Sequence, residues 1–451
     1  MTALTDLSHV SRPLPNGGKV FVLDTGAIIG PEAQAMLGAL HSRNPNGIEN
    51  HLKILAKKGA ESFMQTFYVG YGHKSIADLG AVTVAIEGVS MLAAKAIQDF
   101  PLYNGQEVST RYVDFSTQPF IHPVDDEIGR NIHAQLRSFY LGGLSDLIPD
   151  LKRRFPMNSN EDAGVYEKAI KARAFDIMRA FLPAGASTNL VWFGELRQFA
   201  DRLPLLRNHP LEEVRQIGVA LLQGLLTAFP SSFSEKQYPD TEEYIAGCQT
   251  RYAYLDHVHS MHLGWANRVD RKQLAEYTFA LNARPPKAEL PWEIRECGTM
   301  QFEFHLDFGS FRDLQRHRGV ITRMPMLVAE NGFEQWYINE LPEHLRARAS
   351  ILVEDCAHDL EKLGRPGKWI RQYYLPMGTL SPIRMTGDLR GLVYLLELRS
   401  TRFVHHTLRM RAQQIAEVLL KEFGSAGLVL HLDKDPNRFD VERGTHDLTD
   451  R

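Results

Sequence analysis

A repeated pattern of leucine, proline, glycine and arginine is the feature that most constrains this chain of 451 residues. Leu182-Pro183 is followed by the run Gly194-Glu195-Leu196-Arg197, and Leu375-Pro376 is followed by Gly387-Asp388-Leu389-Arg390. Eleven residues separate the proline from the glycine in both places, and a further arginine follows at 207 and at 399. This agreement predicts an internal duplication. The alternative is that two helix boundaries reached similar chemistry independently.

A second pattern repeats upstream of the first. Residues 82–86 alternate between apolar and polar side chains, as a half-buried strand does, and Ser90 is a candidate N-cap for the helix that follows. Residues 300–306 alternate in the same way, Gly309-Ser310 breaks the pattern, and a helix is predicted over 311–318. The shift between the copies is about 217 residues here and 193 later, which predicts an insertion in the first copy between Phe115 and Arg173.

These repeats predict four regions. Residues 1–237 form a first copy, 238–282 a linker, 283–432 a second copy and 433–451 a polar, poorly ordered tail. The proline-rich stretch at 284–291 is predicted to be a loop that opens the second copy.

Composition and charge exclude several classes of protein. Hydrophobic residues make up 44% of the chain and the net charge is −3, which fits a folded protein without the basic excess that broad nucleic-acid or anionic-membrane binding needs. The three cysteines are far apart and lack CxxC spacing, so neither a disulfide framework nor a zinc knuckle is predicted. No secretory signal and no membrane-spanning run is recognised, and a cytoplasmic location is expected.

Two short segments combine residue types that suit an anionic ligand. The segment at 107–112 offers a carboxylate, two hydroxyls and a guanidinium, and Arg, Ser and backbone N–H groups together are common phosphate ligands. Arg316-His317-Arg318 concentrates positive charge at a predicted helix end and suits a diphosphate or a reduced flavin. The alternatives are a solvated capping loop for the first segment and a surface cluster paired with Asp313 or Glu330 for the second.

At these positions the chain resembles the flavin-dependent thymidylate synthase family. That family carries Arg-His-Arg, then seven residues, then Ser, one further residue and Arg-Tyr, together with an earlier Gly-His and a late Arg. Here the signature is split between the copies. The first copy resembles its second half, with Asp99-Phe100-Pro101 in place of Arg-His-Arg, whereas the second copy keeps Arg316-His317-Arg318 and has Met324, Met326, Val328 and Ala329 in place of the second half.

This complementary loss implies one composite site, because a fused pair of copies needs each half of the signature only once. The resemblance implies an α/β (α+β) fold with a central sheet flanked by helices in each copy, FAD as cofactor, and C5 methylation of dUMP with methylenetetrahydrofolate and NADPH. It also implies a homodimer that resembles the family's homotetramer. Arg207 is the implied catalytic residue, which stabilises negative charge on the uracil ring; its alternative is to neutralise Glu212 or Glu213.

The remaining implied roles are divided between nucleotide and cofactor. Nucleotide binding falls to Glu107, Ser109, Arg111, Tyr112, Arg179, Arg316 and Arg371, and FAD binding falls to His73, Ser75, Asp78, Arg316, His317, Arg318, Asp388 and Arg390.

Three departures leave alternatives open. Asp313 stands where the family has a Gln that contacts the nucleotide, so another uridine nucleotide or another added group remains a candidate. A non-catalytic flavin- or nucleotide-binding relative would also explain the lost motifs. A metal site at His257, His259 and His262 is disfavoured, because the spacing does not bring all three to one helical face, and no metal is predicted.

Overall fold

The chain forms two compact units in the computed structural model, each built from two stretches of chain. Unit 1 comprises Met1–Val108 and Ala186–Ala253, and unit 2 comprises Ser109–Gly185 and Tyr254–Arg451. The structure describes residues 9–23, 30–36, 80–110, 113–255, 263–363 and 367–433, with residues 53, 54, 57, 61, 64 and 78. Unit 2 therefore contains residues from both predicted copies, and the predicted tail after Asp433 lies outside the described residues.

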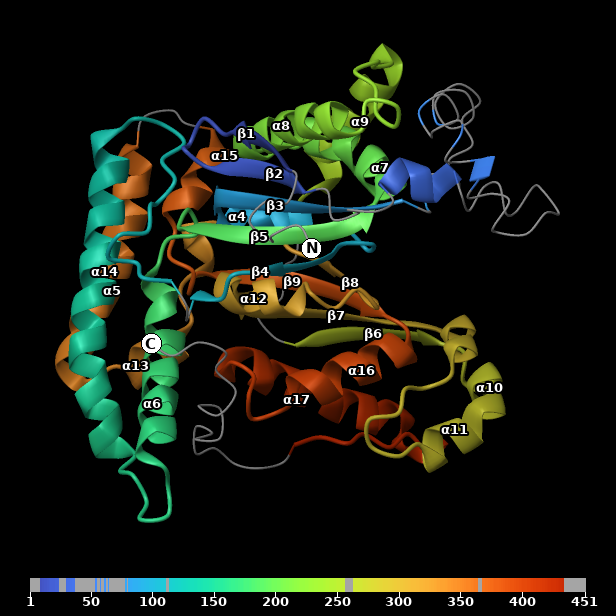
Figure 1. Ribbon diagram of the computed structural model, residues 1–451. Helices are drawn as coiled ribbons and strands as arrows, with labels where there is room; N and C mark the ends of the chain where they lie inside the picture. Colours follow the sequence, from blue (N-terminus) through green and yellow to red (C-terminus); the bar gives the residue numbers. More distant parts are fainter. Residues whose placement is uncertain are drawn as a thin grey trace. The chain divides into compact units, whose positions relative to one another are not determined.

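Unit 1 contains a five-stranded antiparallel sheet in the order β1-β2-β3-β5-β4 (Figure 1). Its described elements are β1 (His9–Pro13), β2 (Lys19–Leu23), β3 (Ala81–Ser90), α4 (Met91–Gln98), β4 (Asn104–Glu107), β5 (Ser187–Glu195), α7 (Leu196–Arg207), α8 (Glu212–Ala228) and α9 (Pro239–Tyr252). The face of the sheet that carries Val82, Val84, Ile86 and Trp192 is fully buried, as the alternating pattern at 82–86 predicts.

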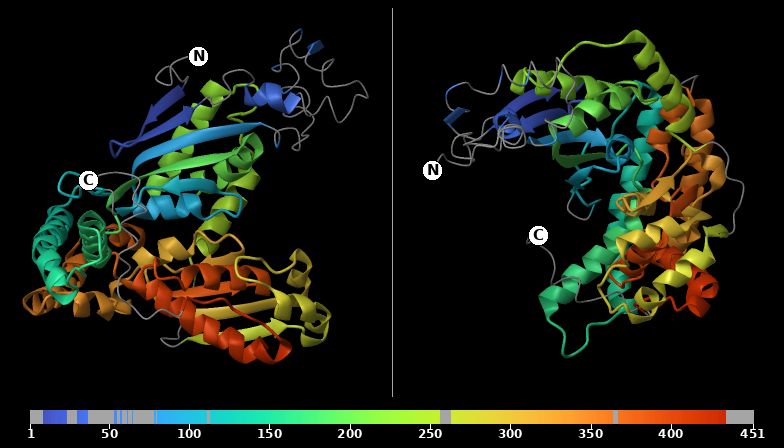
Figure 2. Two further views of the ribbon diagram at one scale, coloured as in Figure 1. Left: turned by 60° about the horizontal axis from the view of Figure 1, so that its bottom comes forward. Right: turned by 90° about the vertical axis from the view of Figure 1, so that its right-hand side faces the viewer.

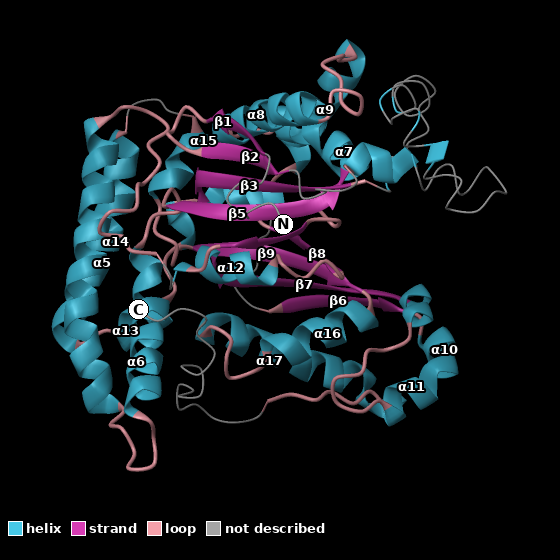
Figure 3. Cartoon of the chain, in the orientation of Figure 1, coloured by secondary structure: helices cyan, strands magenta, loops and turns pink. Residues whose placement is uncertain are grey.

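Unit 2 contains a four-stranded antiparallel sheet in the order β6-β7-β9-β8 (Figure 3). Its described strands and α-helices are α5 (Glu127–Arg154), α6 (Ala163–Met178), β6 (Gly264–Val269), α10 (Arg271–Leu274), α11 (Thr278–Ala283), β7 (Gly298–Asp307), α12 (Phe308–Leu314), β8 (Val320–Arg323), α13 (Gln335–Glu340), α14 (Glu343–Lys362), α15 (Lys368–Arg371), β9 (Leu380–Gly387), α16 (Leu389–Arg399) and α17 (His406–Phe423). Short 3-10 helices lie at Arg179–Phe181, Ala275–Tyr277, Trp292–Cys297, Ala329–Asn331, Gln372–Tyr374 and Gly424–Ala426.

The core of unit 2 has two parts. Phe302, Phe304 and Met385 are buried on one face of the sheet, where α12, α16 and α17 pack. The long helices form the second part, and α5 lies beside α14 (teal and orange in Figure 2). The predicted linker contributes more than a connection, because it contains α9 of unit 1 and strand β6 of the unit 2 sheet.

The two sheets share one arrangement, because β2-β3-β5-β4 of unit 1 has the order of β6-β7-β9-β8 of unit 2. Their registers differ by a β-bulge between Ile86 and Val89 of β3, where Gly88 has φ +67°. The register of β7 on β9 is regular. This extra residue in β3 explains why the sequence left the shift between the copies uncertain by one.

The helix that follows each of these strands begins at a buried hydrogen bond. Ser90 caps α4 by accepting from the Ala93 N–H, as predicted. In unit 2 the prediction was wrong by a turn, because Gly309-Ser310 is the first turn of α12 rather than a break. Asp307 caps α12 by accepting from the Ser310 N–H, and the helix ends at Leu314 rather than at Arg318. A carboxylate cap one residue before an apolar helical run is a start signal that the sequence analysis missed.

The two Leu-Pro segments lie against each other in unit 2. Pro183 and Pro376 form an antiparallel bridge. Four backbone hydrogen bonds surround it in two reciprocal pairs: Ala184 N to Leu375 O (2.8 Å) with Met377 N to Leu182 O (2.8 Å), and Gly185 N to Tyr373 O (2.9 Å) with Gly378 N to Ala180 O (2.8 Å). Each bond becomes its partner when the two segments exchange roles, which is the pattern of a local two-fold axis.

Among the described residues no helix is both long and apolar enough to cross a bilayer. Helices α5 and α14 exceed 18 residues, but both carry many charged side chains.

The bridge between the Leu-Pro segments leads to a stability prediction. A Cβ atom at the buried Gly185 would lie 2.6 Å from the backbone oxygen of Tyr373, so Gly185→Ala must displace one strand of the bridge. We expect it to lower the midpoint of thermal unfolding, at a cost of about 1–3 kcal/mol. Circular dichroism would measure the midpoint.

Gly142→Ala in α5 is the matched control for this substitution. A Cβ at Gly142 meets nothing within 4 Å, and alanine is favoured over glycine inside a helix. We expect its midpoint to stay unchanged or rise. Equal midpoints for the two variants would contradict the proposed tightness of the bridge.

Candidate functional site

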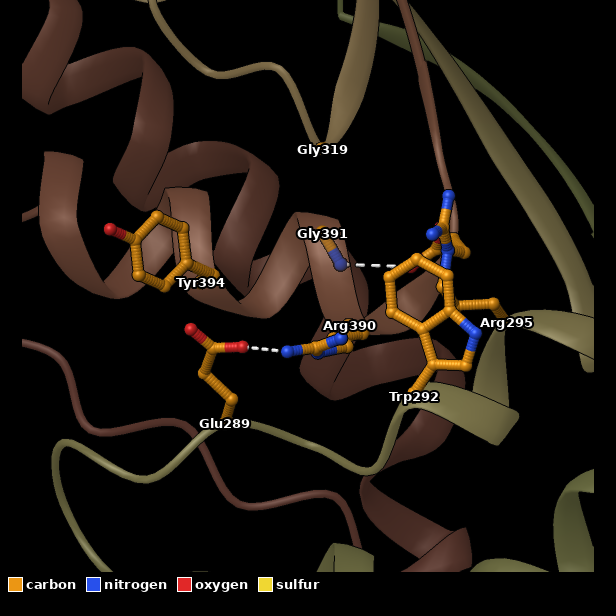
Figure 4. Close-up of a pocket in the computed structure, with 8 residues that line it drawn as sticks. Glu289, Trp292, Arg295, Gly319, Arg390, Gly391 and Tyr394 are labelled. Carbon is orange, nitrogen blue, oxygen red and sulfur yellow. Dashed lines mark hydrogen bonds and ion pairs between the residues drawn. The ribbon is translucent and has the colours of Figure 1, made fainter. Parts of the chain in front are cut away.

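A pocket of about 190 Å³ lies at the N-terminus of α16 in unit 2 (Figure 4). The residues that line it come from three segments around this helix: Glu289, Trp292, Arg295, Gly319, Asp388, Arg390, Gly391 and Tyr394. Two of them, Asp388 and Arg390, are predicted cofactor ligands. The sequence analysis missed the other lining residues, although the proline-rich stretch at 284–291 leads directly into Trp292.

Two ion pairs fix the charged groups of this pocket. Arg295 Nε lies 2.8 Å from Asp388 Oδ2, and Arg390 pairs with Glu289. Asp388 Oδ1 also caps α16 by accepting from the Gly391 N–H at 2.9 Å. The Asp388 carboxylate therefore has a structural role at the helix start as well as a place in the pocket.

Trp292 supplies an apolar face between the two guanidinium groups. The centre of its ring lies 4.2 Å from the Arg295 guanidinium carbon and 5.4 Å from that of Arg390. The side chain is 62% exposed, so its ring is accessible to a ligand. Indole and guanidinium groups together suit a planar ring that carries negative charge.

The predicted Arg-His-Arg cluster follows α12 and is split by burial. His317 is buried, whereas Arg316 and Arg318 are exposed. Arg399 at the end of α16 donates from Nε to His317 Nε2 at 2.6 Å, so His317 Nε2 is an acceptor and its proton is on Nδ1. Burial, with the charge of Arg399, lowers the pKa of His317 to about 3. His317 is therefore neutral near pH 7.

The His317 ring also contacts a residue of the pocket. The centres of the His317 and Tyr394 rings are 6.1 Å apart, in an edge-to-face arrangement. Tyr394 lines the pocket and lies on α16 between Arg390 and Arg399. The structure therefore brings together the predicted cofactor residues His317, Asp388 and Arg390 around one end of this helix.

Asp313 lies among several arginines at the end of α12. Its carboxylate is 3.7 Å from Arg179 and 3.7 Å from Arg316, and its backbone oxygen accepts from Arg399 at 2.8 Å. Burial alone would raise the pKa of Asp313, but Arg316 and Arg179 outweigh it and hold the pKa at about 2. The structure thus brings Arg179 of the first predicted copy next to Arg316 of the second, with an ionised carboxylate between them.

The predicted nucleotide loop is described in part. Glu107 is buried at the end of β4 and accepts from Gln98 Nε2 at 2.7 Å. Ser109 is half-buried at the start of the second stretch, and Arg111 and Tyr112 lie outside the described residues.

Arg207 ends α7 with its side chain paired to a different helix from the one expected. Its Nη2 lies 2.6 Å from Glu242 of α9, and neither Glu212 nor Glu213 is its printed partner. Glu212 pairs with Arg215, and Glu213 accepts from Ser90. Arg207 therefore has a buried carboxylate partner, and its catalytic role stays a prediction.

The contacts of Arg399 are repeated in unit 1 by Arg202, one turn before Arg207. Arg202 Nη2 donates to the Ala96 oxygen at 2.8 Å and its guanidinium carbon lies 5.4 Å from the Phe100 ring centre. Ala96 and Phe100 precede Asp313 and His317 by the same 217 residues. Matching Arg207 with Arg399 by spacing therefore missed the arginine that makes the equivalent contacts.

The remaining predicted ligands differ in how they are placed. Asp78 pairs with Arg197 at 2.9 Å, whereas His73 and Ser75 lie outside the described residues. Arg371 Nε is buried and has no hydrogen-bond partner among the described residues, which leaves a donor for a ligand. Gln372 instead accepts from the Leu327 N–H at 3.0 Å and is a structural residue.

The described residues contain no group of three or more His, Cys, Asp or Glu side chains arranged to hold a metal ion. His257, His259 and His262 lie outside these residues.

Comparison with known proteins gives one family match and several relatives. Residues 30–231 match the family model described as "Thymidylate synthase complementing protein". A UPF0159 protein of Chlamydia muridarum is 24% identical over 478 residues, which cover 93% of this chain and 89% of the relative. A UPF0159 protein of Thermoplasma acidophilum is 25% identical over 423 residues, 78% of this chain and 85% of the relative.

The family match lies on the first predicted copy, where the sequence carries the second half of the signature. It confirms the predicted resemblance for that segment. Residues 30–231 are therefore a domain of the thymidylate synthase complementing type, within a chain that is similar to UPF0159 proteins along most of its length.

Proposed function

We propose that this chain is a duplicated domain of the thymidylate synthase complementing type that carries out flavin-dependent C5 methylation of dUMP. One observation carries the proposal: the family match over residues 30–231 coincides with the half of the signature that the first copy keeps, and the second copy keeps the other half. A site to which both copies contribute would recover the full signature.

Three structural observations support the duplication. The two sheets share a strand order, and the two Leu-Pro segments bond each other reciprocally. The helix caps also correspond: Ser90 donates to Glu213 of α8, whereas Asp307 accepts from Thr407 of α17 at 2.6 Å. Glu213 and Thr407 occupy the second position of their helices, so acid and hydroxyl have exchanged places across one buried hydrogen bond.

The pocket residues fit one end of FAD. Arg295 and Arg390 are guanidinium donors suited to a diphosphate, and Trp292 offers a ring face between them. The volume of about 190 Å³ is smaller than the roughly 300–1,000 Å³ of most ligand pockets, so this pocket would hold only a part of a dinucleotide. His317, neutral and turned by Arg399, supplies its Nδ1 proton nearby.

The chemistry divides between the cofactor and the chain. Reduced flavin supplies the hydride, with NADPH as reductant and methylenetetrahydrofolate as carbon donor. Ser109 and Arg111 would hold the 5′-phosphate of dUMP, and Arg207 would stabilise the negative charge that develops on the uracil ring. His73 would face the flavin ring.

A second candidate is a relative that binds flavin or a nucleotide without this reaction, or with another uridine nucleotide. The pairing of Arg207 with Glu242 favours it, because a guanidinium held by a carboxylate is less able to stabilise charge on a substrate. The two candidates differ in whether bound flavin is reduced by NADPH and whether dUMP is converted.

The first test is the visible absorbance spectrum of the purified chain. We expect a flavin spectrum that bleaches with NADPH and changes when dUMP is added. We expect Arg390→Gln to weaken flavin binding by about tenfold or more, because it removes a charged donor from the pocket.

Arg384→Gln is the control for this variant. Arg384 also pairs with a glutamate in unit 2, at 2.9 Å, and is similarly exposed, but it does not line the pocket. A colourless preparation would contradict the enzyme and favour the second candidate. Equal loss of flavin in both variants would contradict the assignment of the pocket.

The second test separates catalysis from structure at Arg207. We expect Arg207→Ala to lower kcat for dTMP formation by about 100-fold or more while flavin content stays the same. Glu242→Gln removes the partner and keeps the guanidinium, so it should preserve turnover. Arg215→Ala, which breaks the exposed pair with Glu212, is the control for loss of charge. Similar losses in Arg207→Ala and Glu242→Gln would show that the ion pair is only structural.

The third test is the oligomeric state. A duplicated chain that resembles the homotetrameric family should form a homodimer, with two composite sites for each dimer. Sedimentation equilibrium should give twice the chain mass of 51.1 kDa. A stable monomer that still binds flavin would contradict this arrangement.

A further inference from the structure

A carboxylate and two guanidinium groups form a partly open cluster at the end of α12, separate from the lining of the pocket. Asp313 Oδ2 lies 3.7 Å from Arg179 Nη1, and Asp313 Oδ1 lies 3.7 Å from Arg316 Nη1. Both distances exceed those of charge-assisted hydrogen bonds, which are about 2.7–2.9 Å. The carboxylate therefore balances the charge of both arginines without satisfying their N–H donors.

Arg179 shows that an acceptor is missing. Its side chain is 8% exposed, and its Nε has no hydrogen-bond partner among the described residues. Its contact with Ser310 Oγ is long, at 3.5 Å. A buried guanidinium normally has its donors paired, because an unpaired buried donor is costly. The unpaired Nε of Arg179 is therefore a donor without its acceptor.

The nearby Asp307 does not supply that acceptor. Its Oδ1 accepts from the Ser310 N–H and from the Tyr337 hydroxyl, and its Oδ2 accepts from Thr407. These three bonds engage the carboxylate in capping α12. Asp313 is the carboxylate that forms a salt bridge with Arg179 in the described part of the chain.

The packing of the fold alone does not explain an arginine at position 179. The equivalent residue after the shift of 193 is Gln372, which fills its place by accepting from the Leu327 N–H. A neutral amide is thus compatible with this position in the repeated segment. The positive charge of Arg179 calls for a separate explanation.

The cluster is accessible from solvent on one side. The Asp313 side chain is 26% exposed and the Arg316 side chain is 39% exposed, whereas Arg179 lies behind them. An anion in place of the Asp313 carboxylate would reach both guanidinium groups from that side.

We propose that Asp313 is a specificity-determining residue whose carboxylate occupies a two-arginine anion site and so excludes a phosphate group from Arg179 and Arg316. The site itself suits a phosphate monoester, because two guanidinium groups and an unpaired N–H match its oxygens. The inference deepens the proposed function by leaving the nucleotide phosphate to the loop at Ser109. It does not depend on that function, because phosphate binding can be measured directly.

The test is calorimetric titration of the whole chain with inorganic phosphate at low ionic strength. We expect Asp313→Asn to bind one more equivalent of phosphate than the unchanged chain, with an affinity about tenfold or more higher than any the unchanged chain shows at this site. Asp313→Gln removes the same charge and serves if the first variant does not fold. The double variant Asp313→Asn/Arg179→Gln should lose the added equivalent.

Asp359→Asn is the matched control. Asp359 is 25% exposed and pairs with Lys362 three residues later on α14 of the same unit, at 2.9 Å. It removes the same charge from a similar position, and we expect no added equivalent. The proposal is overturned if the Asp313 variants bind phosphate like the unchanged chain, if the Asp359 variant gains as much, or if the double variant keeps the added equivalent.

Discussion

The four reciprocal hydrogen bonds around Pro183 and Pro376 are the interaction on which unit 2 depends. They join two stretches that are 193 residues apart in sequence, each between a short 3-10 helix and a sheet strand. Proline has no N–H, so each bridge must be completed by the residues that flank the proline. Because α6 leads into one segment and α15 into the other, the bridge also fixes where the long helices meet the sheet. Such reciprocity is what a two-fold interface becomes when its two chains are fused.

Buried hydrogen bonds in the two halves persist although the residues that make them have changed. A hydroxyl donates to a carboxylate between Ser90 and Glu213, and the same bond runs in the opposite direction between Thr407 and Asp307. The carbonyl of Ala96 accepts from Arg202, and that of Asp313 accepts from Arg399 one helical turn later. Leaving any of these buried groups unpaired would be costly, so one partner can change only if the other compensates.

The sequence predicted what depends on spacing and missed what depends on contacts across the fold. Alternation at 82–86 and 300–306 predicted two strands correctly, and Ser90 was identified as a cap, because these signals are local. The role of Asp307 was missed, since the Gly309-Ser310 pair that suggested a break is accommodated inside the first helical turn. Arg207 was matched with Arg399 by spacing, yet Arg202 makes the equivalent contacts, which only helix packing decides.

The candidate site was predicted by residue type but not by its balance of charge. Arg390, Arg295 and Arg179 each face a carboxylate, from Glu289, Asp388 and Asp313 respectively. These acids lie up to 134 residues from their partners in sequence, so no local motif reveals the pairing. Each guanidinium therefore meets a ligand only in competition with an internal anion. An anionic ligand must either replace a carboxylate or bind beside it, and exposure decides which: the half-exposed Glu289 can turn to solvent, whereas Asp388 is held by its helix cap.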